Sequence, residues 1–189
     1  MIGAITAGLL TGGAPAVTNS YESIATYTVG AGGQSTISFT TIPQTFKHLQ
    51  IRAIARTSNP TTLDDTWIRF NSDAGSNYRS HQLRGDGASA TAADLGSATY
   101  AASFPVPGTS TTSSIFAGGV IDILDYTNTN KNKTVRSLSG YDANGSGNIF
   151  FRSSLWLNTS AITQIDLTWQ NGAYNAPQYS SFALYGIKG

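Results

Sequence analysis

HLQIRAIAR, the stretch from His48 to Arg56, decides the fold class because its apolar and polar residues alternate. Successive side chains of a strand point to opposite faces, so this pattern predicts a half-buried β-strand. The inward face would carry Leu49, Ile51, Ala53 and Ala55, and the outward face His48, Gln50, Arg52 and Arg56. Only Ile54 interrupts the polar face.

Similar segments separated by turn residues recur along the chain, and we expect about nine strands from them. Trp67–Phe70 and Tyr78–Leu83 are predicted to pair as a hairpin around the Asn- and Gly-containing loop 71–77. Residues 85–113 resemble a long excursion around a weak strand near 99–104. No segment has sustained helical spacing of apolar residues. The sequence therefore predicts an all-β protein, a single antiparallel β-sandwich of jelly-roll type over residues 20–189.

The composition narrows the classes of function. Charged residues make up 11% of the 189-residue chain, against roughly 25% in ordinary globular proteins. The net charge of +1 gives no basic surface for a nucleic-acid partner, and the absence of cysteine excludes disulfides and thiolate sites. Low surface charge favours association. We therefore expect a chain that assembles with other copies.

Residues 1–19 are predicted to form an extended, glycine-rich anchoring arm. Its apolar stretch MIGAITAGLL is shorter than the ~20 residues of a membrane-spanning helix, and no Lys or Arg precedes it as in a signal peptide. Two readings stay open, an arm folded on its own sheet and an arm docked on a neighbouring subunit, and the second is favoured. Its anchoring residues would be Ile2, Ile5, Leu9 and Leu10.

Catalytic and metal-binding patterns are sparse. Glu22 is the only glutamate, and the pair Asp64-Asp65 is interpreted as a solvated turn. Loops 71–77 and 142–148 carry oxygen ligands at alternate positions but lack the bidentate Glu of a calcium loop, so they are interpreted as Asn/Gly turns. We expect no enzymatic activity, no cofactor and no metal.

Aromatic residues near loops leave one alternative function open. Tyr100, Tyr174 and Tyr179 are candidates for a shallow contact with a glycan or a protein, because tyrosine offers an apolar face and a polar hydroxyl. The alternative is a carbohydrate-binding module for recognition of a host surface.

Several stretches carry a family resemblance: SYESIAT (20–26), IPQTFKHLQIR (42–52), RFNSD (69–73) with SNY (76–78), IDI (121–123), WLNTSAIT (156–163) and SFALYGIKG (181–189). Together they resemble a group of bacteriophage virion proteins found in phages of marine bacteria and cyanobacteria. The resemblance implies a non-enzymatic structural protein of the virion, either a tail fibre or tail component or a capsid decoration or head fibre. It implies other virion proteins as partners, and by analogy with fibres and decorations we expect a homotrimer.

Overall fold

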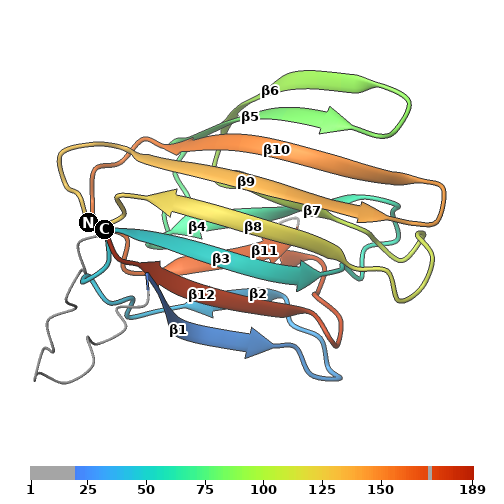
Figure 1. The fold of residues 1–189 in the computed structure, drawn as a ribbon, viewed down its shortest axis with the longest axis horizontal. Helices are drawn as coiled ribbons and strands as arrows, with labels where there is room; N and C mark the ends of the chain where they lie inside the picture. Colours follow the sequence, from blue (N-terminus) through green and yellow to red (C-terminus); the bar gives the residue numbers. More distant parts are fainter. Residues whose placement is uncertain (1–19, 170–171) are drawn as a thin grey trace, which may run out of the picture.

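The computed structural model of the chain describes residues 20–169 and 172–189, and this part contains twelve strands in two antiparallel sheets (Figure 1). In order from one edge, the large sheet contains β1 (Tyr21–Thr28), β12 (Ser181–Ile187), β3 (His48–Ala55), β8 (Ala117–Leu124), β9 (Lys133–Asp142), β10 (Gly147–Trp156), β5 (Tyr78–Gly85) and β6 (Ala90–Ala98). The small sheet contains β2 (Thr36–Phe39), β11 (Ile165–Trp169), β4 (Asp64–Phe70) and β7 (Ala101–Val106).

The strand order is that of a jelly roll with two added hairpins. The orders β1-β12-β3-β8 and β2-β11-β4-β7 correspond to the two four-stranded sheets of an eight-stranded jelly roll, in which the chain crosses repeatedly between the sheets. Hairpins β5-β6 and β9-β10 are inserted in the sequence, and both extend the large sheet beyond β8. The predicted all-β sandwich of jelly-roll type is confirmed, with twelve described strands instead of about nine.

Two local predictions about strands were wrong. The segment 85–113 contains a whole strand, β6, besides β7; β6 lacks apolar alternation because it is an edge strand exposed over most of its length. The hairpin predicted from Trp67–Phe70 and Tyr78–Leu83 does not form. The loop between them instead carries the chain from the small sheet to the large sheet, where β5 pairs with β10 and β6.

The alternation of β3 is confirmed on its inward face, but two residues predicted to be exposed, Gln50 and Arg56, are buried. Gln50 is 8% exposed because it is hydrogen-bonded between Arg52 and Asp122 on the outer face. Leu49, Ile51, Ala53 and Ala55 are buried in the core, as predicted. Arg56 was expected to point to solvent, but it is only 8% exposed. Its guanidinium donates hydrogen bonds of 2.7–3.0 Å to four backbone carbonyls, those of Gly108, Thr111, Thr112 and Ile115. The strand ends before Arg56, and loop 108–115 supplies the acceptors that bury it.

Serine side chains attach the edge strand β7 to the large sheet. Ser154 of β10 donates to the carbonyl of Ala102 (2.9 Å), and Ser80 of β5 accepts from the amide of Ala102 (3.1 Å). The two hydroxyls also bond each other at 2.7 Å. Ser137 of β9 donates to the carbonyl of Ser103 at 2.5 Å. These bonds satisfy backbone groups that an edge strand leaves unpaired.

Candidate functional site

The extension of the large sheet leaves part of its inner face uncovered. Arg152 and Phe150 of β10 pair with Gln82 and Arg84 of β5, so the four side chains form a square on one face. The next pair along these strands, Ser154 and Ser80, lies under β7. The four side chains of the square lie beyond β7. Together with Asp65 and Trp67 of β4 and with Tyr100, they line a groove of about 290 Å³. We call this the β5–β10 groove.

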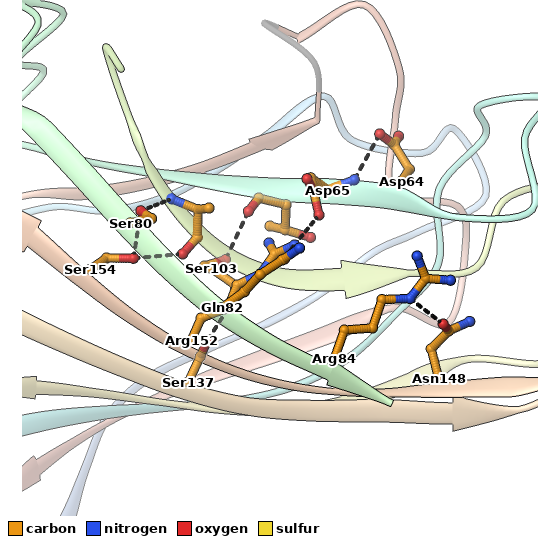
Figure 2. Close-up of polar contacts among 12 residues, drawn as sticks. Asp64, Asp65, Ser80, Gln82, Arg84, Ser103, Ser137, Asn148, Arg152 and Ser154 are labelled. Carbon is orange, nitrogen blue, oxygen red and sulfur yellow. Dashed lines mark hydrogen bonds and ion pairs between the residues drawn. The ribbon is translucent and has the colours of Figure 1, made fainter. Parts of the chain in front are cut away.

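Arg152 organises the floor of the groove (Figure 2). Its side chain is 3% exposed, and one guanidinium nitrogen, Nη2, donates to Asp65 at 2.8 Å and to Gln82 at 2.9 Å. Nε also donates to Gln82, while Nη1 is buried without a hydrogen-bond partner among the described residues. Arg152 therefore fixes the positions of a carboxylate from the small sheet and an amide from the large sheet.

Arg84 and Phe150 form the second half of the floor. The guanidinium carbons of Arg84 and Arg152 lie 5.6 and 5.2 Å from the centre of the Phe150 ring, within cation–π distance. Figure 2 shows the Arg84 side chain extending toward Asn148, whose amide oxygen accepts from Nε at 2.8 Å. In the described part of the chain, the two terminal amino groups of Arg84 have no hydrogen-bond partner, although the charge of Arg84 acts on the nearby carboxylate of Asp86.

A stacked aromatic pair forms one wall. The rings of Trp67 and Tyr100 are 3.6 Å apart between centroids and only 4° from parallel. Both side chains are half-buried, and burial raises the pKa of the Tyr100 hydroxyl, which stays neutral and able to donate at physiological pH. The pair offers a flat apolar surface beside the polar floor.

The interpretation of Asp64-Asp65 as a solvated turn was wrong. Both residues belong to β4, where they pair with Val106 and Pro105 of the neighbouring strand. Asp64 points inward, is 4% exposed, and burial raises its pKa. The Asp65 side chain is 42% exposed, and only its Oδ1 is bound by Arg152. Its Oδ2 is therefore a free acceptor at the groove.

In the two loops that resembled calcium loops, several of the candidate ligand oxygens accept hydrogen bonds from other groups of the protein, both within the loops and from Thr163, Gln164 and Arg84. The Asp73 carboxylate accepts from Gly75, Asn77 and the indole of Trp156, and Asp142 accepts from the amide of Asn144. Within the described ranges, no three His, Asp or Glu side chains gather in a way that could hold a metal ion. These contacts are typical of Asn/Gly turns.

The three predicted tyrosines do not share one site. Tyr100 lies at the β5–β10 groove. Tyr174 packs partly buried against the core, and Tyr179, 72% exposed with a positive φ of 74°, lies in the connection from β11 to β12. Contacts by Tyr174 and Tyr179 stay a prediction. The anchoring residues Ile2, Ile5, Leu9 and Leu10 lie outside the described residues.

The outer face of the large sheet carries a second candidate surface. Val120, Leu138, Phe151 and Leu83 are direct neighbours across β8, β9, β10 and β5, and each is 36–57% exposed. The adjacent row adds Ile54 (55% exposed) and Ile149 (65%), separated by glycines. We call Ile54, Leu83, Val120, Leu138, Ile149 and Phe151 the outer apolar patch. Monomeric proteins rarely expose contiguous apolar rows of this kind.

Four groove residues were not predicted as site residues from the sequence: Trp67, Gln82, Arg84 and Arg152. One signal was present in residues 149–156, IFFRSSLW, where Arg152 alternates with Phe150, Ser154 and Trp156 and therefore points inward. A charged residue on a core-facing row indicates a buried ion pair or a site.

Comparison with family models, curated proteins and solved structures finds no match to this chain. In residues 20–169 and 172–189, no helix has the length and apolar character needed to cross a membrane. The fold and the two surfaces thus define a jelly-roll domain with a polar, aromatic groove on one face and an apolar patch on the other.

Proposed function

We propose that this chain is a non-enzymatic structural component of a bacteriophage virion, exposed on the particle as a tail or fibre component or as a capsid decoration. The observation that carries the proposal is the jelly-roll strand order, which is the architecture of many viral capsid and lectin domains. The low charge of the chain and its sequence resemblance to phage virion proteins also support it.

The outer apolar patch gives the proposed assembly a surface. Copies of this chain associate through the patch, and a homotrimer is the arrangement to test first. Burying one leucine-sized side chain contributes about 1.5–3 kcal/mol, so Leu138→Lys should weaken self-association at least about tenfold. Mass measured by light scattering over a concentration series reads this out. Thr134→Lys, exposed on the same face of β9 outside the patch, is the matched control.

The arm 1–19 anchors the domain to the particle in this proposal. Deleting residues 2–19 leaves every described strand in place, so the truncated chain should fold and melt cooperatively. It should then be missing from purified particles that incorporate the full-length chain. Incorporation of the truncated chain at normal levels would show that the arm is not the anchor.

Immunogold labelling of purified particles tests the proposal itself. Antibodies against the chain should label intact particles at one position, the capsid surface or the tail. Detection of the chain in infected cells but not in washed particles would contradict a virion role.

A further inference from the structure

We infer that the β5–β10 groove binds a neutral sugar ring, an activity that goes beyond the proposed structural role. At about 290 Å³ the groove lies just below the usual range of ligand pockets, roughly 300–1,000 Å³, so it suits a single sugar residue of a longer glycan.

The aromatic wall suits the apolar face of a sugar ring. Trp67 and Tyr100 lie parallel at 3.6 Å, so each ring covers one face of the other. The two rings together form a flat stack at the edge of the groove. A stack of this kind buries the C–H face of a pyranose while the sugar hydroxyls stay directed toward polar groups. Of the two rings, only Tyr100 was predicted from the sequence as a candidate contact.

The polar floor offers both donors and an acceptor, as hydroxyl groups require. Arg84 has two free amino groups, Gln82 has its amide nitrogen free because its oxygen accepts from Arg152, and Asp65 has Oδ2 free. Each sugar hydroxyl both donates and accepts, so it can bridge a guanidinium and a carboxylate. Arg152 acts as a positioning residue, because its bonds hold Asp65 and Gln82 in place.

Charge balance selects a neutral ligand. The floor contains two guanidinium groups, and each interacts with a carboxylate. Asp65 bonds Arg152 at 2.8 Å, and the pKa of Asp86 is lowered by hydrogen bonds from the amides of Ser89 and Ala88 and by the charge of Arg84. The carboxylate of a uronate would be attracted by Arg84 but repelled by the free carboxylate oxygen of Asp65. A cationic ligand would meet Arg84 and Arg152. A neutral hexose avoids both penalties.

The test is binding of the purified full-length chain to an array of neutral gluco-, galacto- and manno-oligosaccharides printed beside uronate-containing ones. Calorimetric titration then follows with the neutral oligosaccharide that binds best. Ordinary ligand efficiency gives a dissociation constant of about 1 mM for one sugar ring. Failure of all neutral oligosaccharides to bind at several millimolar, or preference for the uronates, would overturn the inference.

Variants place the binding in the groove. Trp67→Ala and Arg84→Ala should each weaken binding at least about tenfold, and Trp67→Phe should retain part of it because a stacking ring remains. Tyr21→Ala is the control, since Tyr21 is exposed on strand β1 and does not line the groove, and Tyr179→Ala tests the other exposed tyrosine that was predicted to contact a glycan. If Trp67→Ala does not fold, Arg84→Ala decides alone. Binding lost in Tyr179→Ala but kept in Arg84→Ala would show that the sugar does not bind in the β5–β10 groove. Particle labelling tests the virion role separately, since neither result depends on the other.

Discussion

Arg56 provides the sharpest test of how the loop that follows the small sheet is held. Replacing it by alanine removes four hydrogen bonds of 2.7–3.0 Å to the carbonyls of residues 108–115. Hydrogen bonds to charged groups contribute about 1.5–3 kcal/mol each, but the desolvation of a guanidinium, which also lowers the pKa of Arg56, offsets much of the sum. We expect Arg56→Ala to lower the free energy of unfolding by about 2–4 kcal/mol.

Urea denaturation followed by tryptophan fluorescence measures this loss, because Trp156 and Trp169 are buried in the core. Arg56→Lys should lose less, about 1–2 kcal/mol, since one ammonium has three donors for four carbonyls. Arg136→Ala is the control and should change stability little, because Arg136 is exposed on the outer face of β9 and makes one 3.5 Å ion pair with Asp122. An Arg56→Ala variant as stable as the parent chain would show that loop 108–115 does not depend on the guanidinium.

Three further predictions concern the fold. Ser154→Ala should cost about 1–3 kcal/mol in urea denaturation because it leaves buried polar groups of β7 unpaired, whereas the outward Ser153→Ala should be neutral. For Asp73, burial opposes ionisation, but hydrogen bonds from an indole and two amides outweigh it and lower its pKa. The stability that the ionised Asp73 carboxylate adds to the folded state is therefore fully present above the unfolded pKa of about 3.9. It is lost as pH falls through the lower folded pKa. Asp73→Asn should lower the free energy of unfolding at pH 7 and make it fall less steeply as pH is lowered. An unchanged dependence on acid pH would refute this. Gly186→Ala should lower the melting temperature, because an added Cβ would lie 2.3 Å from the Phe46 ring, and Phe46→Leu in the same chain should restore part of the loss.

The fold class was predictable from sequence because alternation and turn residues are local signals. The inward set of β3 follows from period-two alternation and is confirmed. The pairing of β4 was not predictable, since an alternating strand fits a local hairpin and a crossover between sheets equally well. Edge strand β6 has little apolar content, so it gave no strand signal.

The candidate groove was mostly hidden from sequence analysis. It joins residues from β4, β5, β6 and β10 and from the turn before β7, which only the tertiary fold brings together. Asp65 and Arg152 are 87 positions apart in the chain, and no local pattern links them. Tyr100 was singled out by residue type alone, without its partner Trp67. Loop tyrosines are therefore a weak guide to a site formed on strand faces.

An electron-microscopy reconstruction of the intact particle tests the central claim most directly. We predict density that fits the two-sheet jelly roll on the particle surface, with the outer apolar patch covered by a neighbouring subunit and the β5–β10 groove open to solvent. Absence of this density from the capsid and the tail of particles that encode the chain would contradict the account.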